Sequence, residues 1–187
     1  VLEPARAAGS TIGSFHPLVA FAEQEAAVRA LEGAAVAVEG DDELVVLLGQ
    51  LATDIGAQPV RLPPAGKTAY HAAAVLAAGG FVGLLDGIAE VARGAGLDEA
   101  GALAIYAPLI RGSLSNAETV GIERALTGPF VRGDSGTVRD HLAALRRLAP
   151  GALELYRAVA QRELAMAVHR GELDEEQAAA MRRLLEA

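Results

Sequence analysis

The first sixty or so residues alternate short apolar runs with segments whose apolar residues have helical spacing. The apolar runs predict strands at 11–15, 34–39 and 58–62, each followed by turn-forming residues. Leucines at helical spacing between the last two strands predict a helix over 43–55. Its buried face is expected to carry Leu44, Leu47, Leu48 and Leu51. Strands that alternate with helices are typical of a parallel α/β layer, but so few strands do not form a stable sheet of this kind alone.

From residue 65 onward, the apolar residues follow helical spacing almost without interruption. Glycines and prolines punctuate this part, and Asp98, Ser135 and Asp174 are suited to cap the helices that follow them. The sequence therefore predicts an α/β remnant over 1–63 and an all-α domain over 64–187. The predicted helices cover 67–95, 98–111, 117–126, 137–148, 151–169 and 174–185.

The composition narrows the classes of function. The chain has 187 residues, 52% of them hydrophobic, which is sufficient for a substantial core. Its net charge of -8 and its lack of a basic run make nucleic acid a poor partner. Without cysteine it forms no disulfide and no thiolate site, so we expect a cytoplasmic protein.

A long stretch without charged side chains covers residues 68–85. It consists mostly of alanine and glycine, has Tyr70 and His71 at one end, and is followed at once by Asp86 and Glu90. These features favour a buried helix of a water-soluble domain over a helix that spans a bilayer.

Lys67 is the single lysine among sixteen basic side chains, and it lies where the long apolar helix begins. A lysine ammonium can give up a proton, whereas an arginine guanidinium cannot usefully do so. The alternative is that arginine richness is a compositional bias and this lysine is the residue left over. His71 lies four residues later, so both side chains share one helix face.

Two neighbouring donors of this kind suit the reduction of a carbonyl, in which an acid protonates the oxygen while a hydride reaches the carbon. Lys67 and His71 are therefore the candidate catalytic residues. The alternative is a capping or surface lysine beside a histidine that is satisfied in the core.

A second candidate group is the His16-Pro17 turn, which follows a predicted strand. Residues beyond the carboxyl ends of parallel strands line the ligand crevice of α/β proteins, although a histidine before proline is also a routine turn component. A third group comes from polar loops of the helical half, where Arg132 can clamp a carboxylate or pair with Asp134. The candidate substrate-binding residues are His16, Asn116, Thr127, Arg132 and Asp134.

Three sequence segments together carry a resemblance to a known group of proteins. They are 13–18 (GSFHPL), 67–74 (KTAYHAAA) and 125–134 (ALTGPFVRGD). The chain resembles Rossmann-like proteins with a C-terminal helical domain of unknown function. These are relatives of the deazaflavin-dependent NADP oxidoreductases and of the 6-phosphogluconate and β-hydroxyacid dehydrogenases. Some members look like alternative ketopantoate reductases.

This resemblance implies the last strands of a Rossmann-type parallel sheet over 1–63 and a 6-phosphogluconate dehydrogenase C-terminal-like substrate and dimerisation domain over 64–187. In the superfamily, a lysine at the start of the inter-domain helix donates to the substrate oxygen, and an asparagine follows four residues later. Lys67 matches that lysine, and His71 replaces the asparagine. Ala78-Gly79-Gly80 stands where closer relatives often carry another asparagine.

The resemblance also implies a cofactor, NADP (NADPH), with His16 and Pro17 near it, and a small 2-oxo or 3-oxo acid as substrate, with ketopantoate as the leading candidate. The glycine-rich strand-turn-helix that holds the cofactor diphosphate in the family does not occur in this sequence. We therefore expect the isolated chain to bind NADPH poorly and to be inactive. A homodimer is expected through apolar helical faces such as those of Leu103, Ile105, Leu109 and Ile110.

Two other classes of function compete with the reductase. One is a non-catalytic helical dimerisation or ligand-binding module in which Lys67 and His71 are structural. The other is a metal-dependent hydrolase that uses Asp134 and His141, which is disfavoured because no second histidine or carboxylate falls at ligand spacing.

Overall fold

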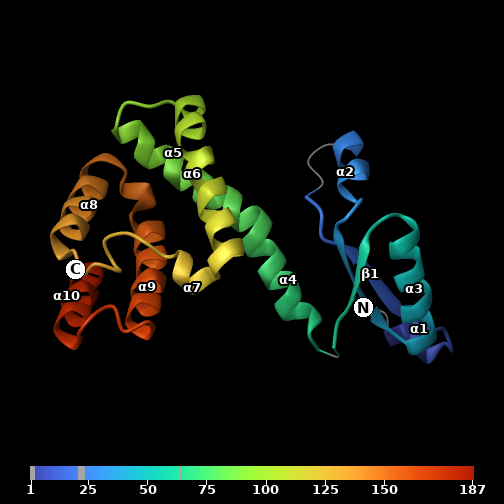
Figure 1. Ribbon diagram of the computed structural model, residues 1–187. Coiled ribbons are helices and arrows are strands. Elements are labelled where there is room, and N and C mark those ends of the chain that lie inside the picture. Colours follow the sequence, from blue (N-terminus) through green and yellow to red (C-terminus); the bar gives the residue numbers. More distant parts are fainter. Residues whose placement is uncertain (1–2, 21–23, 64) are drawn as a thin grey trace. The chain divides into compact units, whose positions relative to one another are not determined.

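A computed structural model describes residues 3–20, 24–63 and 65–187 (Figure 1). The contacts divide the chain into a sheet unit, Val1–Phe81, and a helical unit, Val82–Ala187. The long helix that begins at Lys67 therefore starts in the sheet unit, whereas the sequence predicted a division at 63/64. Each unit is described by itself.

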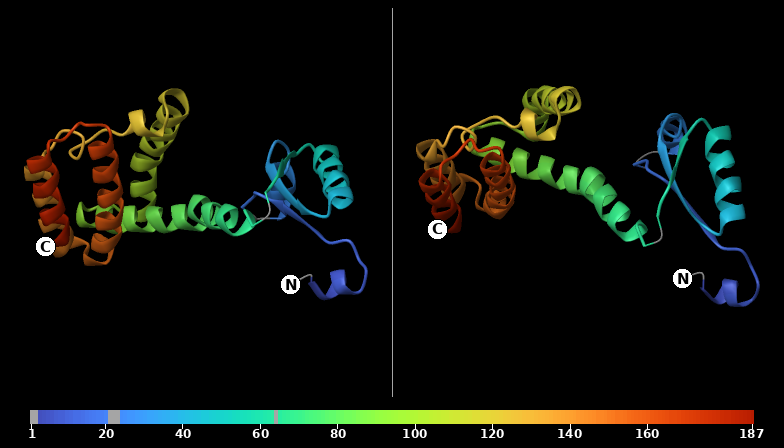
Figure 2. Two further views of the ribbon diagram at one scale, coloured as in Figure 1. Left: turned by 90° about the horizontal axis from the view of Figure 1, so that it is seen from below. Right: turned by 60° about the horizontal axis from the view of Figure 1, so that its bottom comes forward.

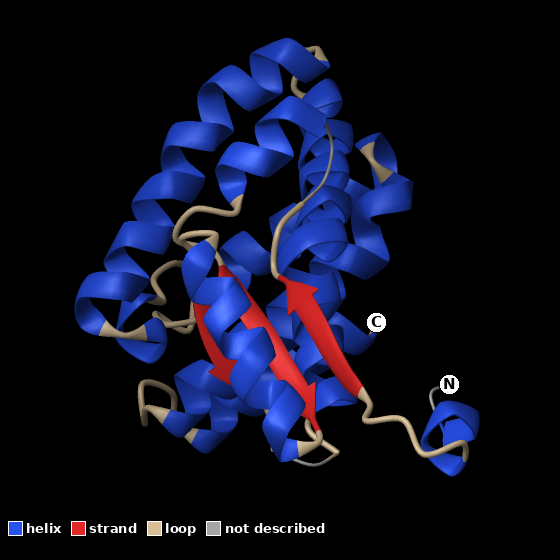
Figure 3. Cartoon of the chain, turned by 90° about the vertical axis from the view of Figure 1, so that its right-hand side faces the viewer, coloured by secondary structure: helices blue, strands red, loops and turns tan. Residues whose placement is uncertain are grey.

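The sheet unit contains the three predicted strands, each within one or two residues of its expected position (Figure 3). They are β1 (Gly13–Pro17), β2 (Ala35–Gly40) and β3 (Gln58–Arg61), in the order β1-β2-β3. β2 and β3 are parallel, but β1 runs antiparallel to β2. The prediction of an entirely parallel layer was therefore wrong, because the connection between β1 and β2 contains no sequence signal for strand direction. Two short helices, α1 (Glu3–Ala7) and α2 (Gln24–Ala30), complete the N-terminal part.

One face of the sheet packs against α3 (Asp42–Asp54). Val36 and Val38 of β2 are buried there with Val45 and Ala52 of α3. The predicted leucine face of this helix is only partly correct, because Leu44 and Leu48 are partly buried. Leu47 and Leu51 are exposed. Apolar residues surround almost the whole helix, so periodicity did not select the buried face.

A continuous helical segment over 67–94 confirms the long helix predicted from sequence. It consists of α4 (Lys67–Val75), a π-helical turn η1 (Leu76–Gly80) and α5 (Phe81–Gly94). By length and composition alone it could cross a membrane. The expectation that it is buried was wrong for the described chain, since 11% of its most apolar 18-residue window is buried.

The helical unit continues with α6 (Glu99–Val120), α7 (Ile122–Ala125) and α8 (Ser135–Leu148), and then with a 3-10 turn η2 (Pro150–Ala152), α9 (Leu153–His169) and α10 (Glu175–Glu186). The break predicted near 112–116 does not occur, because a helix interior tolerates a glycine at a cost of about 1 kcal/mol. The helix ends instead at Gly121, whose φ of 87° is a left-handed value that glycine adopts freely.

Three aspartates cap helices of this unit. Asp98 accepts a hydrogen bond from the Gly101 backbone N–H, as predicted, and Asp174 forms a reciprocal capping box with Gln177. The third cap is Asp134 rather than the predicted Ser135.

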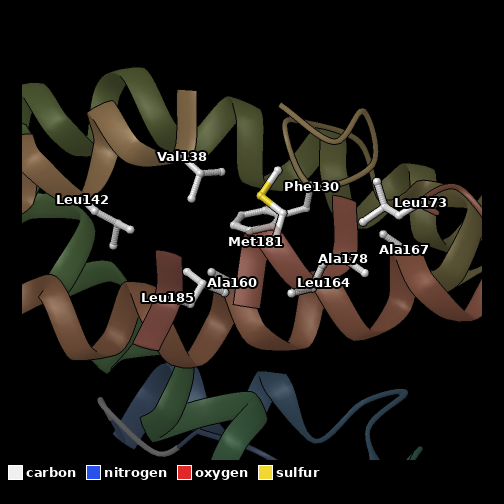
Figure 4. Packing of buried hydrophobic residues seen from close by; sticks show 10 residues of the cluster. All are labelled: Phe130, Val138, Leu142, Ala160, Leu164, Ala167, Leu173, Ala178, Met181 and Leu185. Carbon is white, nitrogen blue, oxygen red and sulfur yellow. The ribbon is translucent and has the colours of Figure 1, made fainter. Parts of the chain in front are cut away.

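The main core lies between α8, α9 and α10, which lie side by side in both views of Figure 2. Figure 4 shows the aromatic ring of Phe130 and the thioether of Met181 at its centre. The loop residue Phe130 is thus buried among residues of three helices. The other buried members are Val138, Leu142, Ala160, Leu164, Ala167, Leu173, Ala178 and Leu185.

Candidate active site

A group of polar side chains lies on the face of the sheet opposite to α3. Strand residues alternate between faces, and the register pairs Ser14 with Glu39 and His16 with Ala37. These four residues therefore share one face. They line a small cavity together with Lys67, Tyr70 and His71 from the first turns of α4. The apolar face of the sheet is packed, whereas this face carries titratable groups.

Lys67 connects α4 to both strands. Its Nζ donates a hydrogen bond to Ser14 Oγ at 2.6 Å and forms a salt bridge with Glu39 Oε1, also at 2.6 Å. An ammonium has three protons to donate, so one remains for a further acceptor. The Lys67 side chain is 49% exposed, which leaves it accessible to a ligand.

Three aromatic rings lie beside this lysine. The His16 ring contacts His71 edge-on, with ring centroids 5.6 Å apart, and contacts Tyr70 in the same manner at 6.1 Å. The Tyr70 hydroxyl is buried and has no hydrogen-bond partner among the described residues. The structure thus brings the predicted residues His16, Lys67 and His71 together within the sheet unit. Pro17 ends the same strand.

A larger pocket of about 320 Å³ opens next to Lys67, at the carboxyl ends of β2 and β3. Lys67, Ser14 and Glu39 border it from one face of the sheet, and Arg61 and Val45 border it from the other. The carboxyl ends of parallel strands are where α/β proteins bind ligands. His16 does not follow the carboxyl end of a parallel strand, as was predicted, because β1 is antiparallel to β2. The carboxyl end of β1 lies at the opposite end of the sheet from this pocket.

The rim of this pocket is fixed by Asp41 at the start of α3. Its carboxylate accepts a hydrogen bond from the Ile12 backbone N–H at 2.8 Å and pairs with Arg6 at 2.9 Å. The hydrogen bond from Ile12, and to a lesser degree the Arg6 guanidinium, hold the pKa of Asp41 below its ordinary value. Asp41 thus ties α1 and the start of β1 to α3.

The remaining predicted substrate-binding residues belong to the helical unit, and their predicted role stays a prediction. Asn116 lies within α6, while Thr127 and Arg132 are exposed residues of the loop before α8. Asp134 accepts hydrogen bonds from the Thr137 backbone N–H and Oγ1, which lower the pKa of its carboxyl group. The Arg132–Asp134 salt bridge considered from sequence does not form between these two described residues.

Three residues of this site, Ser14, Glu39 and Tyr70, were not predicted from the sequence. Ser14 and Tyr70 lie in two of the segments that carried the resemblance, but nothing in their spacing indicated that they meet Lys67. Glu39 was regarded as the end of a strand. Only the antiparallel register of β1 and β2 places Ser14 beside Glu39.

No group of three or more potential ligands for a metal ion occurs among residues 3–20, 24–63 and 65–187. His141, the candidate of the hydrolase hypothesis, forms a 3.0 Å hydrogen bond through Nδ1 with the Tyr156 hydroxyl. Burial raises the pKa of Tyr156 to about 12. The described residues therefore offer no support for the hydrolase.

Comparisons with known proteins identify relatives of this fold. The family model described as "Domain of unknown function (DUF2520)" matches residues 34–163, and no curated protein matches the chain. Protein TM1727 from Thermotoga maritima is 28% identical, with a TM-score of 0.68 over 84% of this chain and 62% of that protein. The putative NADP oxidoreductase BF3122 from Bacteroides fragilis is 19% identical, with a TM-score of 0.67 over 83% and 58%. The chain therefore spans about three fifths of the length of these two solved structures.

Proposed function

This chain belongs to the DUF2520 family, and we propose that its sheet unit carries the proton donor of an NAD(P)-dependent reductase that acts on a small oxo acid. The main support for this proposal is Lys67, the single lysine, which lines a pocket of about 320 Å³. One of its ammonium protons remains free after its bonds to Ser14 and Glu39. The likeness of the fold to that of a putative NADP oxidoreductase supports the same class of reaction.

The proposed role of Lys67 is general acid. A ketone that enters the pocket accepts the free Lys67 proton at its carbonyl oxygen, which becomes the hydroxyl of the product alcohol. Ser14 and Glu39 hold the ammonium in place during this step, because each fixes one of its other protons. His71 lies one helical turn further, on the same face of α4, and lines the small cavity beside Lys67 rather than the larger pocket, so its proposed assistance to Lys67 is indirect.

A nicotinamide cofactor supplies the hydride in reactions of this class. The described turn between a strand and a helix at β2 and α3 does not fit the cofactor diphosphate. It carries Asp41, Asp42 and Glu43 at the start of the helix, where their negative charges oppose a bound phosphate. We therefore propose that the described residues bind the substrate carbonyl and supply the proton, and that the turn between β2 and α3 does not contact the diphosphate.

We propose small 2-oxo or 3-oxo acids as substrates, with ketopantoate as the first to test. The pocket volume of about 320 Å³ is at the lower end of the range for small-molecule sites. A pocket of this volume accommodates a small oxo acid.

The test is NADPH oxidation by the complete gene product with a panel of such acids. We expect Lys67→Met to lower kcat by about two to four orders of magnitude, because the general acid is lost. Arg146→Met on α8 is the control for an exposed cation remote in sequence, and its rate should match the wild type. A lysine that only stabilises the fold would instead lower the melting temperature of Lys67→Met and leave kcat unchanged. A non-catalytic module would show no NADPH oxidation even in the wild type.

We further propose that the helical unit associates with a second copy of itself. Leu103, Ile105 and Leu109 of α6 are large apolar side chains that remain exposed. Leu109 and Ile110 also line an apolar groove of about 290 Å³ between α5, α6 and α9. Sedimentation equilibrium of the chain should give a dimer, and Leu109→Glu should give a monomer. A wild-type chain that stays monomeric when its concentration is raised 100-fold would refute the proposal.

A further inference from the structure

Three cationic side chains, Lys67 among them, border the larger pocket, and they differ in how firmly each one is held. Arg6, Arg61 and Lys67 all line it, in a chain whose net charge is -8. Each forms a salt bridge with a carboxylate, to Asp41, Asp42 and Glu39 respectively. The environment of the carboxylate decides which cation is available to a ligand.

Arg6 and Lys67 are paired with sheltered carboxylates. The side chains of Asp41 and Glu39 are only 28% and 26% exposed. Asp41 is also bound by the Ile12 backbone N–H, so releasing Arg6 from it would disturb the rim of the pocket. These two cations therefore already have structural or, for Lys67, proposed catalytic duties.

Arg61 is paired with a carboxylate that is almost fully in solvent. The Asp42 side chain is 89% exposed and the Arg61 side chain is 64% exposed. Exposed salt bridges of this kind contribute little to stability, so a ligand can replace Asp42 at little cost. The displaced Asp42 carboxylate stays hydrated, because it already faces water.

The position of Arg61 relative to Lys67 fits a ligand with two polar ends. Arg61 is the last residue of β3, and the register places it beside Val38, on the α3 face of the sheet. Lys67 lies on the other face with Glu39, and the pocket spans the strand ends between them. A guanidinium offers two parallel N–H donors that match the two oxygens of a carboxylate.

We propose that Arg61 is the specificity-determining residue of this site and that it binds the carboxylate of an oxo acid whose carbonyl oxygen meets Lys67. This inference rests on the proposed function, and it replaces Arg132 by Arg61 as the carboxylate clamp. It restricts the substrates to ketones that also carry a carboxylate. Neutral ketones of the same shape are poor ligands.

The test is a binding experiment that needs no cofactor and no turnover. Because Lys67 is the single lysine, labelling with 13C-lysine gives one Cε signal that reports directly on the site. The 187-residue chain is titrated with 3-methyl-2-oxobutanoate and, in parallel, with the neutral ketone 3-methyl-2-butanone. We expect the acid to shift the Lys67 signal and to bind at least about tenfold more tightly than the ketone, as a charged hydrogen-bonded pair requires.

Arg61→Gln should abolish this preference, while Arg61→Lys should retain part of it because the charge remains without the paired donors. Arg146→Gln on α8 is the matched control and should bind as the wild type does. A melting curve of each variant shows that the sheet unit remains folded. Inorganic phosphate is the competing anion, and displacement of the acid by millimolar phosphate would assign the site to phosphate instead and overturn the proposal.

Two further results would overturn it: a wild-type chain without preference for the acid, or an Arg61→Gln chain that keeps the preference. If Arg132→Gln removes the preference and Arg61→Gln does not, the clamp lies in the helical unit. None of these outcomes depends on hydride transfer. Failure of the carboxylate assignment is therefore distinguishable from failure of the reductase assignment, which is measured by NADPH oxidation.

Discussion

The two units of this chain divide packing and polar chemistry between them. The helical unit has ten buried residues in one core, centred on Phe130 and Met181. The sheet unit has five, and its edge strand β3 is exposed along its whole length. Conversely, the sheet unit holds Lys67, His16, His71 and the buried Tyr70 hydroxyl on one sheet face. A small core beside a polar cluster is typical of a region of lower stability that carries a functional site.

The largest expected effect tests whether the two units unfold separately. Phe130→Ala removes a ring that is 2% exposed, which should cost the helical unit about 3–5 kcal/mol. Hydrogen exchange followed by mass spectrometry should show faster exchange in α8, α9 and α10 but unchanged exchange in β2. Ile122→Ala, at an exposed apolar position, is the control and should leave both regions unchanged. Equal acceleration in β2 would show that the two units unfold as one.

The reciprocal change destabilises the sheet unit. Gly40 has a φ of 136°, and a Cβ there would lie 2.3 Å from the Ile12 carbonyl oxygen. Gly40→Ala should therefore cost about 1–3 kcal/mol from backbone strain alone, and more from the clash. Gly49→Ala is the control, because its Cβ would meet only ordinary contacts. Urea unfolding, followed by hydrogen exchange in peptides that contain β2, measures the difference in stability between the two variants. Equal unfolding midpoints would contradict the strain assigned to Gly40.

A smaller effect is expected in the response of each unit to acid. Hydrogen bonds hold the pKa values of Asp41 in the sheet unit and Asp134 in the helical unit below the ordinary value of 3.8. Both carboxylates therefore stabilise the fold above that pH, and this contribution is lost as the pH falls through the lowered pKa. Asp134→Asn keeps a good N-cap residue but removes the charge, so the melting temperature should depend less on pH below 4. A melting temperature that falls as steeply as in the wild type would assign the acid sensitivity to other groups.

The smallest expected effect has the opposite sign. Burial raises the pKa of Glu163 on α9, so this group favours the folded state at low pH, and that advantage is lost as the pH rises through the raised pKa. Glu163→Gln should therefore raise the melting temperature slightly at pH 7 and leave it unchanged at pH 4. Glu154→Gln would be an unsuitable control, because Glu154 pairs with Arg157. Glu176→Gln on the surface of α10 is preferable, and an equal gain in that variant would exclude burial as the cause.

Sequence periodicity was sufficient for the strands and for most of the longer helices, because these depend on local spacing. It did not predict α1 or α2, and it divided α6 into two helices. It failed where long-range contacts decide: the direction of β1, the buried face of α3, and the exposure of the helix over 67–94. The same limit applies to the site. Lys67 and His71 were predicted from their spacing on one helix, but Ser14 and Glu39 join them only through strand register, and Arg61 through the end of β3.

The proposed role of Lys67 as proton donor to the substrate oxygen is tested most directly by chemical rescue of Lys67→Ala in the complete gene product, with NADPH oxidation measured at increasing concentrations of methylammonium. We expect a rate that rises with the amine and then saturates, because the added ammonium replaces the lost acid in the pocket. A low rate that no amine restores, in a variant that is folded and still binds the oxo acid, would contradict the assignment of Lys67 as the general acid.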